Sequence, residues 1–203
     1  MTPADLILLR HGRTEWNAAG RFQGQLDSQL DEVGREQVRA VAEVLAKRGI
    51  GRLVTSDQMR ALHTAHEVGH RTGVDVHVDP RLREIDLGHW SGLTRDEVAV
   101  RFPEEYASWA AGEDLARGGG ETPEQVGDRA LAVITEHLEL LEPGAGALVA
   151  VTHGFTARTV MLRLLGLPRS ARYAFDVLGN CRWVLLGRTD GGIWRIREYN
   201  AGT

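Results

Sequence analysis

The chain has 203 residues, of which 26% are charged and 42% hydrophobic, and its formal net charge is −4 at pH 7. These values are ordinary for a globular domain and exclude a disordered or strongly basic chain, so we expect no nucleic-acid partner. The longest apolar stretches, such as residues 145–151, are too short to span a bilayer, so we expect no membrane partner. The sequence therefore predicts a single domain over residues 1–203.

Strands and helices alternate in the first part of the chain. Residues 6–9 form an apolar run typical of a strand buried on both faces. Apolar residues at helical spacing up to Leu45 predict a helix, with Asp31 as its N-cap and Gly49 as its stop. A second strand at residues 52–55, a helix at about 58–71 and a third strand at 74–78 are expected next.

The alternation is interrupted between about residue 85 and residue 120. This part reads as loops and short helices, and the capping box Thr94-x-x-Glu97 predicts where one of these helices begins. We interpret it as an excursion of the chain over the active-site edge of the sheet. Its aromatic residues Trp90, Phe102, Tyr106 and Trp109 either wall a pocket or pack the excursion onto the sheet, and packing is expected for at least half of them.

Alternation resumes after the excursion. Thr122, Pro123 and Gln125 mark the start of a helix expected to run to about Leu141. A fourth strand at 148–152 and a helix at about 155–165 follow. Two closing strands at 182–186 and 193–198 are joined by the turn Asp190-Gly191-Gly192. The whole pattern predicts an α/β fold whose sheet is mainly parallel with an antiparallel edge.

Cationic and imidazole side chains follow three of the predicted strands. Arg10 and His11 follow the first strand, Arg60 lies just behind the second, and His153 with Gly154 follows the fourth. Ligands of open α/β sheets bind at the carboxyl ends of the parallel strands, so we expect these residues to meet there. Arginine forks, imidazole N–H groups and the N-terminus of the helix near Phe155 suit a phosphate dianion.

Such a pocket also allows reaction. A neutral imidazole nitrogen can displace an alcohol in line at phosphorus, and the leaving oxygen then needs a proton. Glu84, where the excursion begins, is the best-placed carboxyl group, and a phosphate dianion beside it favours its protonated form. The sequence therefore indicates phosphoryl transfer through His11 with Glu84 as the acid.

Other interpretations of these residues remain open at this point. A single Arg-His-Gly is a weak motif, and a lone His after a strand is more often structural than catalytic. His63, His66 and His70 recur at helical spacing and suggest a transition-metal site, although a solvated helix face explains them as well. Cys181 is the only cysteine and the chain enters its first apolar run directly after Met1–Asp5, which predicts a cytoplasmic protein.

The order of these motifs resembles the histidine phosphatase superfamily, which is also called phosphoglycerate mutase-like. The resemblance implies a three-layer α/β/α sandwich and a phosphohistidine intermediate at His11. Glu84 is then the general acid and base, without a metal or an organic cofactor, and family members are often homodimers. The matching segments are residues 8–17, Phe22-Gln23-Gly24-Gln25-Leu26-Asp27, residues 56–61, Leu82-Arg83-Glu84, Trp90-Ser91-Gly92, Gly120-Glu121-Thr122 and Thr152-His153-Gly154.

The resemblance also assigns the phosphate-binding residues. They are Arg10, Arg60, His153 and Gly154, with Asn17, Gln23 and Gly24 at the rim of the pocket. One residue departs from the family pattern, because Phe155 stands where a second Gly or another small or polar residue is usual. We expect Phe155 to narrow the pocket or to favour a substrate with an apolar face.

Members of this family are either phosphatases or mutases. Gln25 stands where classical cofactor-dependent phosphoglycerate mutases usually have Trp, and Ile85 departs from their Glu-Arg-His-Tyr-Gly signature. We therefore expect a phosphatase that hydrolyses phosphate monoesters of small metabolites, with a mutase as the alternative. A non-catalytic relative that binds phosphorylated ligands is disfavoured because His11 and Glu84 are both present.

Overall fold

The computed structural model describes residues 5–113 and 115–202. The sequence analysis also used the first residues of the chain, which precede the first strand. Of these, Met1–Ala4 lie outside the described residues. The strands are β1 (Asp5–Arg10), β2 (Ile50–Thr55), β3 (Val76–Val78), β4 (Ala147–Thr152), β5 (Trp183–Arg188) and β6 (Trp194–Ala201). The α-helices are α1 (Glu15–Ala18), α2 (Glu32–Leu45), α3 (Met59–Thr72), α4 (Arg95–Arg101), α5 (Pro103–Ala110), α6 (Pro123–Glu139) and α7 (Gly154–Leu164). Short 3₁₀ helices are η1 (Pro80–Leu82), η2 (Gly88–Trp90), η3 (Arg117–Gly119) and η4 (Arg169–Ala174).

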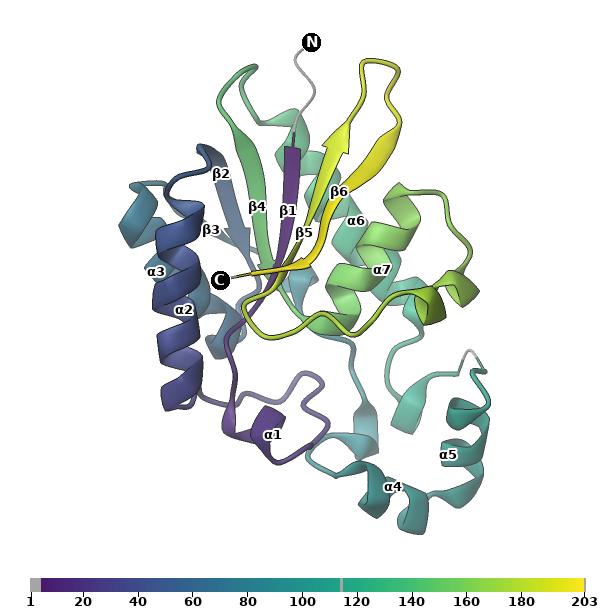
Figure 1. The fold of residues 1–203 in the computed structure, drawn as a ribbon. Coiled ribbons are helices and arrows are strands. Elements are labelled where there is room, and N and C mark those ends of the chain that lie inside the picture. The colour runs from purple at the N-terminus through teal and green to yellow at the C-terminus, as the bar shows by residue number, and fades with distance from the viewer. Residues whose placement is uncertain (1–4, 114, 203) are drawn as a thin grey trace.

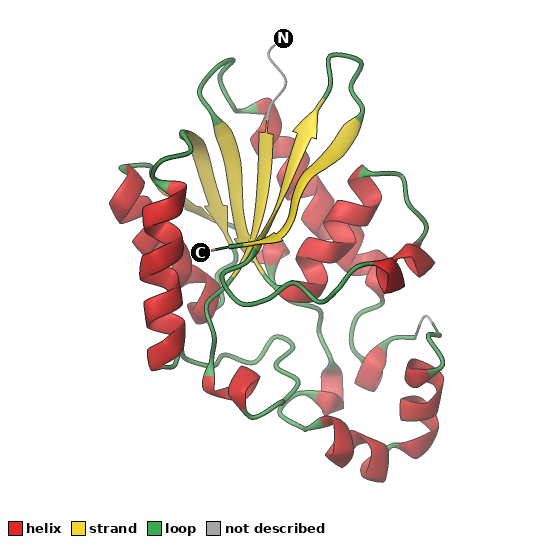
Figure 2. Cartoon of the chain, viewed as in Figure 1, coloured by secondary structure: helices red, strands yellow, loops and turns green. Residues whose placement is uncertain are grey.

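The six strands form one sheet in the order β3-β2-β4-β1-β5-β6. The first four strands of that order pair in parallel, and β5 and β6 add an antiparallel edge. Helices cover both faces, with α2 and α3 on one side and α6 and α7 on the other (Figures 1 and 2). The predicted three-layer α/β/α sandwich with a mainly parallel sheet is confirmed.

Alternation along the central strands explains the two layers of core. Leu6 and Leu8 of β1 face the cluster that contains the apolar sides of α6 and α7. Ile7 and Leu9 face the cluster packed under α2 and α3. Because both faces of β1 are covered by helices, its sequence is a continuous apolar run rather than an alternating one.

Helix starts lie where capping residues predict them. The Asp31 side chain accepts a hydrogen bond from the backbone N–H of Gly34 at the start of α2. Thr94 and Thr122 form complete capping boxes at the starts of α4 and α6. Each box satisfies backbone donors that the first turn of a helix leaves free, so these boundaries could be predicted from sequence.

The segment from η2 to η3 lies beyond the carboxyl ends of the parallel strands (Figure 1). Trp90 and Val98 of this segment form an apolar cluster with Ile85, Leu87 and Val126, and Tyr106 and Trp109 pack against it. The two ends of the segment touch backbone to backbone. Gly88 and Gly118 have positive φ values of 46° and 61°, and a Cβ atom on either would overlap the main chain of the other end. This contact fixes where η3 and its Arg117 lie relative to the sheet.

The structure also differs from the sequence predictions in places. The predicted third strand begins two residues later, at Val76, and the closing strands extend to Arg188 and Ala201. Helix α1 was not expected from the sequence, because it is only one turn long and is held by the Thr14–Asn17 capping box. None of the helices in residues 5–113 and 115–202 is long and apolar enough to cross a membrane.

Candidate active site

The register of the central strands brings the two candidate histidines together. Arg10 of β1 pairs with Thr152 of β4, so His11 and His153 are the next residues on two adjacent parallel strands. Their ring centroids are 5.1 Å apart. Arg60 reaches the same place from the first turn of α3, after β2. The prediction that these residues meet at one edge of the sheet is confirmed.

The hydrogen bond of His11 identifies its reactive nitrogen. Its Nδ1 lies 2.7 Å from the carbonyl oxygen of Gly12. A carbonyl only accepts, so Nδ1 carries the proton and the lone pair of Nε2 is free. Burial and the neighbouring Arg60 and Arg10 hold the pKa of His11 well below its usual value of 6.5. The ring is therefore a neutral potential nucleophile in a cavity of about 260 Å³.

The cationic side of the cavity carries donors that have no partner. Arg60 donates from Nε to Nδ1 of His153 at 3.3 Å, so the proton of His153 is on Nε2. Within the described residues, His153 Nε2 and Arg10 Nε are buried and make no hydrogen bond. Unpaired buried donors are costly in a folded protein, and an oxyanion in the cavity would satisfy both.

Backbone carbonyls hold the two arginines in place. Arg60 donates from Nη1 to Leu26 and from Nη2 to Gly24, and Arg10 donates from Nη1 to Leu178. Burial lowers the pKa of Arg60 to about 10, so it remains a cation at neutral pH. The cavity therefore presents two fixed guanidinium charges to an anion before any ligand arrives.

The predicted rim residues line the same cavity. The Oδ1 atom of Asn17 accepts hydrogen bonds from Thr14 and from Asn180, and Oε1 of Gln23 accepts one from Ser28. Each contact orients its carboxamide by occupying the oxygen, which leaves the NH₂ group as the remaining donor. Gly24 and Gly154 line the cavity with main chain, and a Cβ atom on Gly154 would lie 3.4 Å from Nε of Arg10.

Glu84 lies at the N-terminus of α7. Its Oε1 accepts hydrogen bonds from the backbone N–H groups of Ile85 and Thr156 and lies 3.0 Å from the Thr156 hydroxyl. Its Oε2 accepts one hydrogen bond, from the N–H of Phe155 at 3.1 Å. Oε2 therefore has the greater remaining capacity to carry a proton.

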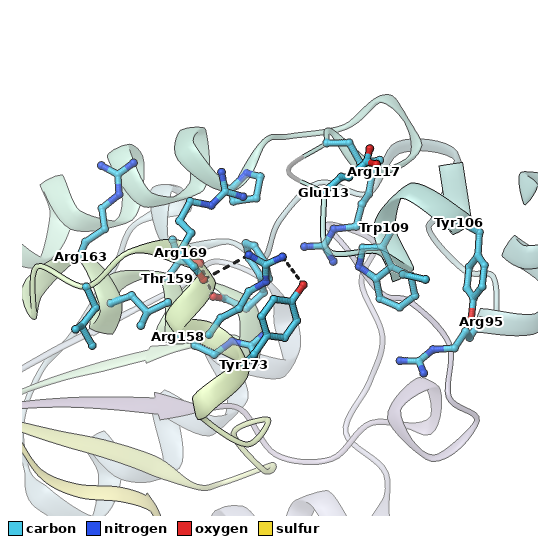
Figure 3. A pocket seen from close by; sticks show the side chains of 17 residues that line it. Arg95, Tyr106, Trp109, Glu113, Arg117, Arg158, Thr159, Arg163, Arg169 and Tyr173 are labelled. Atoms are coloured by element: carbon cyan, nitrogen blue, oxygen red, sulfur yellow. Dashed lines mark hydrogen bonds between the residues drawn. The ribbon is translucent and has the colours of Figure 1, made fainter. Parts of the chain in front are cut away.

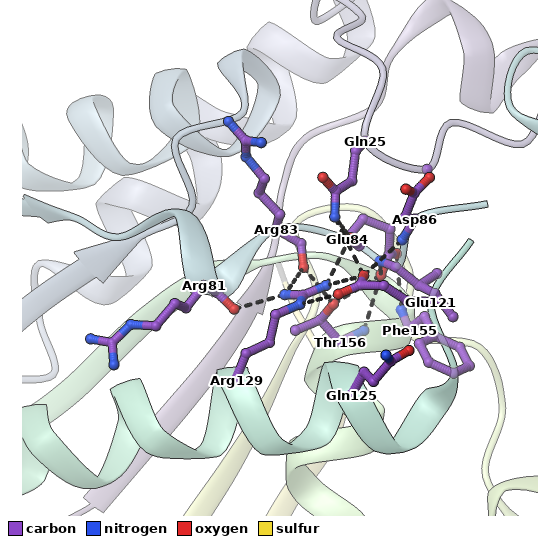
Figure 4. A network of polar contacts seen from close by, with 12 residues as sticks. Gln25, Arg81, Arg83, Glu84, Asp86, Glu121, Gln125, Arg129, Phe155 and Thr156 are labelled. Carbon is purple, nitrogen blue, oxygen red and sulfur yellow. Dashed lines mark hydrogen bonds and ion pairs between the residues drawn. The ribbon is translucent and has the colours of Figure 1, made fainter. Parts of the chain in front are cut away.

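A network behind Glu84 fixes its main chain (Figure 4). Arg129 of α6 donates to the carbonyl oxygens of Arg81, Arg83 and Glu84 and forms a two-pronged ion pair with Glu121. Glu121 in turn accepts from the N–H of Asp86 and from the side chain of Gln25. Gln25, which stands where classical mutases usually have Trp, thus belongs to this network.

Several residues of the site were missed by sequence reasoning. Gln58 joins the N–H of Glu84 to the carbonyl of Gly24, and Asn180 donates to the main chain of His11. Arg117 and Arg158 also line the cavity. Gln58 lies in residues 56–61, one of the segments that match the family, but the match does not predict its hydrogen bonds to Glu84 and Gly24. Asn180 and Arg117 carried no signal, because their places depend on segments with no fixed spacing to the strands, and Arg158 of α7 matched no motif.

The alternative metal site does not form a cluster. His63, His66 and His70 lie on the exposed face of α3. In the described part of the chain, no three His, Cys, Asp or Glu side chains gather closely enough to hold a metal ion. A solvated helix face accounts for the three histidines.

Comparison with known proteins defines the class to which this fold and pocket correspond. The model of the histidine phosphatase superfamily (branch 1) matches residues 6–202. The chain belongs to this superfamily.

Individual relatives narrow the comparison. The chain is 41% identical to a glucosyl-3-phosphoglycerate phosphatase of Mycolicibacterium vanbaalenii, over 97% of this chain and 94% of the relative. It is 35% identical to a probable phosphoglycerate mutase of Yersinia pestis, over 87% and 81% of the two chains. A solved mycobacterial glucosyl-3-phosphoglycerate phosphatase in complex with VO₃ superposes with a TM-score of 0.89 at 37% identity, over 98% of this chain and all of the other.

Proposed function

We propose that the protein is a phosphoric monoester hydrolase that acts on small phosphorylated metabolites through a phosphohistidine at His11. The observation that carries this proposal is a pair of buried donors, Arg10 Nε and His153 Nε2, which have no hydrogen-bond partner among the described residues and lie near the free Nε2 of His11. A phosphoryl group in this cavity satisfies both donors and lies next to a neutral nucleophile.

In the first half-reaction, the lone pair of His11 Nε2 forms a bond to phosphorus while the ester P–O bond breaks. The leaving oxygen takes the proton from Glu84, so an alcohol departs and Glu84 becomes a carboxylate. A phosphate dianion beside Glu84 favours the protonated acid at the start, since two adjacent negative charges repel. Arg10 and Arg60 balance the charge on the equatorial oxygens, and the neutral ring of His153 donates a hydrogen bond to one of them.

In the second half-reaction, the Glu84 carboxylate takes a proton from water. The water oxygen forms a bond to phosphorus as the N–P bond breaks, which returns a neutral His11 and a protonated Glu84 and releases phosphate. No step needs a metal or an organic cofactor.

Glucosyl-3-phosphoglycerate is the substrate that we propose to test first. Two observations support it. The relative that is 41% identical over nearly the whole chain is named for this substrate. The segment Phe22-Gln23-Gly24-Gln25-Leu26-Asp27 also resembles glucosyl-3-phosphoglycerate phosphatases and their broad-specificity relatives more than it resembles other members. Broad specificity is the alternative within the phosphatases.

Phosphorus NMR separates hydrolysis from transfer. The purified protein is incubated in chelator, in separate tubes, with glucosyl-3-phosphoglycerate, with 3-phosphoglycerate, and with 3-phosphoglycerate plus its bisphosphate primer. We expect release of inorganic phosphate that disappears in His11→Ala. Interconversion of phosphoglycerate isomers without release would identify a mutase, the activity for which the Yersinia pestis relative is named.

We further propose a cytoplasmic location. Cys181 is the only cysteine of the chain, and burial raises the pKa of its thiol to about 12. A chain with one cysteine has no pair for the internal disulfides that are common in oxidising compartments, which supports a reducing compartment. Cell fractionation with a specific antibody tests this, and recovery in the secreted or periplasmic fraction would contradict it.

A further inference from the structure

The phosphate cavity lies next to a second cavity of about 400 Å³. Arg117, Phe155 and Arg158 line both spaces, so the two are adjacent and these side chains stand at their boundary. The volume of the second cavity lies within the range of about 300–1,000 Å³ that is typical of small-molecule sites. A large leaving group that extends past these side chains from a phosphate at His11 would enter it.

The walls of the second cavity combine aromatic rings with arginines (Figure 3). Tyr106 and Trp109 of α5 and Tyr173 of η4 supply the rings. Arg95, Arg117, Arg158, Arg163, Arg169 and Arg172 line it as well, and Glu113 is the one acidic lining residue among residues 5–113 and 115–202. The cavity is thus strongly cationic and suits an anionic ligand with a flat apolar face.

Most of these arginines have another partner. Arg163 pairs with Asp128, Arg95 lies over the ring of Trp109, and Arg172 donates to Gly112. Arg117 and Arg158 differ, because within the described residues neither forms a hydrogen bond or an ion pair with a carboxylate. The guanidinium of Arg117 lies over the ring of Phe155, 4.6 Å from its centroid, and in the view of Figure 3 it points into the space between Trp109 and Tyr173.

Arg117 and Arg158 remain cations although they are partly buried. Burial lowers the pKa of Arg117 to about 10, and repulsion from Arg158 contributes in the same direction. Burial also lowers the pKa of Arg158. Glu84 attracts both, but its carboxyl group belongs to the reaction site. Two half-buried, mutually repelling cations are stabilised when an anion lies between them.

We propose that Arg117 and Arg158 bind a carboxylate on the leaving group of the substrate, and that Tyr106 and Trp109 contact the ring of a sugar attached beyond it. This proposal rests on the phosphatase function proposed above and specifies its substrate class: phosphate monoesters of a hydroxy acid, with space for a glycosyl group. Phe155 is then the element that holds Arg117 between the two cavities.

A pair of substrates that differ in one group tests the carboxylate site. 3-Phosphoglycerate carries a carboxylate where glycerol 3-phosphate carries a hydroxymethyl group. The ratio of kcat/KM for the two is measured in the wild type, in Arg117→Gln and in Arg158→Gln. We expect each substitution to lower this ratio by about tenfold to a hundredfold, the cost of losing one charge-assisted hydrogen bond. Arg71→Gln removes an equal charge from the exposed face of α3, where Arg71 pairs with Glu43, and should leave the ratio unchanged.

An unchanged ratio in both cavity variants, or an equal fall for both substrates, would overturn the carboxylate site while leaving the phosphatase proposal intact. Hydrolysis of p-nitrophenyl phosphate that is lost in His11→Ala checks the phosphatase function separately. If the wild type hydrolysed no monoester, titration calorimetry of the two glycerol derivatives would still decide the binding proposal. Equal affinities for both would contradict it.

The aromatic part of the cavity is tested with the glycosylated substrate. Trp109→Ala should lower kcat/KM for glucosyl-3-phosphoglycerate at least about threefold more than for 3-phosphoglycerate, because only the former reaches the ring. Since Trp109 also packs against Phe22, the melting temperature of the variant is measured alongside. Equal losses for both substrates would remove Tyr106 and Trp109 from the proposed site.

Discussion

At the scale of single residues, burial determines which form each side chain of the pocket takes. His11 and His153 are both 3% exposed or less and lie beside Arg10 and Arg60, so the neutral form of each ring is favoured. Their hydrogen bonds then select opposite functions. The ring of His11, which lines the cavity, has a free lone pair on Nε2, and the neighbouring ring of His153 has an N–H on Nε2.

Because both rings are neutral in the folded protein, the free energy of unfolding should depend on pH. The pKa of His11 and that of His153 are well below 6.5 in the folded protein, mainly because of burial, whereas an unfolded chain binds protons at these residues near pH 6.5. The free energy of unfolding should therefore fall as the pH drops below about 6.5, by about 1.4 kcal/mol per pH unit for each histidine.

Urea denaturation between pH 7.5 and 5 measures this slope. His153→Gln keeps an acceptor for Arg60 but removes one titrating ring, so its slope should be smaller by the contribution of one proton. An identical slope in the variant would show that His153 is protonated in the folded protein.

The role proposed for Glu84 predicts an effect that depends on the leaving group. Glu84→Gln keeps an acceptor for the N–H groups of Phe155 and Thr156 but cannot donate the proton of a carboxylic acid. We expect kcat/KM for glycerol 3-phosphate to fall by about 10²–10⁴-fold. The fall for p-nitrophenyl phosphate should be much smaller, because p-nitrophenolate leaves without a proton.

Since kcat/KM reports only the steps through the first bond cleavage, the later use of Glu84 as a base does not disturb this comparison. Equal losses for the two substrates would mean that Glu84 does not protonate the leaving oxygen.

At the scale of elements, the site depends on how α6 and α7 hold the segment around Glu84. Helix α7 supplies N–H groups to the carboxylate, and α6 supplies Arg129 to the carbonyl oxygens behind it. The position of the acid is therefore set by contacts between helices and loops that are distant along the chain.

Removal of Arg129 should weaken both the fold and the activity. Arg129→Met removes the guanidinium donor from the carbonyl groups of Arg81, Arg83 and Glu84 and breaks the ion pair with Glu121. We expect a loss of about 2–3 kcal/mol in the free energy of unfolding and a lower kcat/KM.

Arg81→Met is the matched control, because the half-exposed side chain of Arg81 forms its ion pairs with Asp79 and Glu136 near the surface, and it should cost less than Arg129→Met, about 1 kcal/mol. Denaturant titration of the two variants compares them. Equal losses would show that the network does not stabilise the fold.

Whether an element could be predicted from the sequence depends on whether local patterns or tertiary contacts determine it. The buried strands, the capped helices and the residues directly after β1 and β4 were predicted, because periodicity and capping are local signals. Helix α1 and the contacts of Gln58 and Asn180 were not predicted, since short turns and loop contacts depend on tertiary packing. For the aromatic residues of the excursion, both interpretations hold in part. Trp90 is fully buried and Phe102 packs beside it, whereas Tyr106 and Trp109 line the second cavity.

At the scale of the whole molecule, the pocket couples ligand binding to folding. Its donors come from β1, α3 and the end of β4, and they converge only when the sheet is complete. An anion that satisfies Arg10 Nε and His153 Nε2 binds the folded protein and not the unfolded chain, so it must stabilise the fold.

Inorganic phosphate, the expected product, should therefore raise the melting temperature. At a concentration 100 times its Kd the stabilisation is about 2.7 kcal/mol, which corresponds to a rise of about 5–11 °C for a protein of this size. Scanning calorimetry in phosphate and in sulfate-free chloride buffer of equal ionic strength measures it. The rise should be lost in His153→Ala, and a rise of the same size in that variant would place the phosphate elsewhere.

The strand order has a consequence for how the chain is made. β1 leaves the ribosome before the other strands of the sheet, yet its two neighbours in the sheet are β4 and β5, which begin at Ala147 and Trp183. Until β4 has been synthesised, the apolar residues 6–9 have no neighbouring strand to pair with, and an unpaired apolar strand is prone to aggregation. Ribosome-bound chains that stop before Ala147 should consequently depend on chaperones that bind extended apolar peptides. The nucleophile is synthesised before Arg60, Glu84 and His153, and it becomes active only when all three have reached their places.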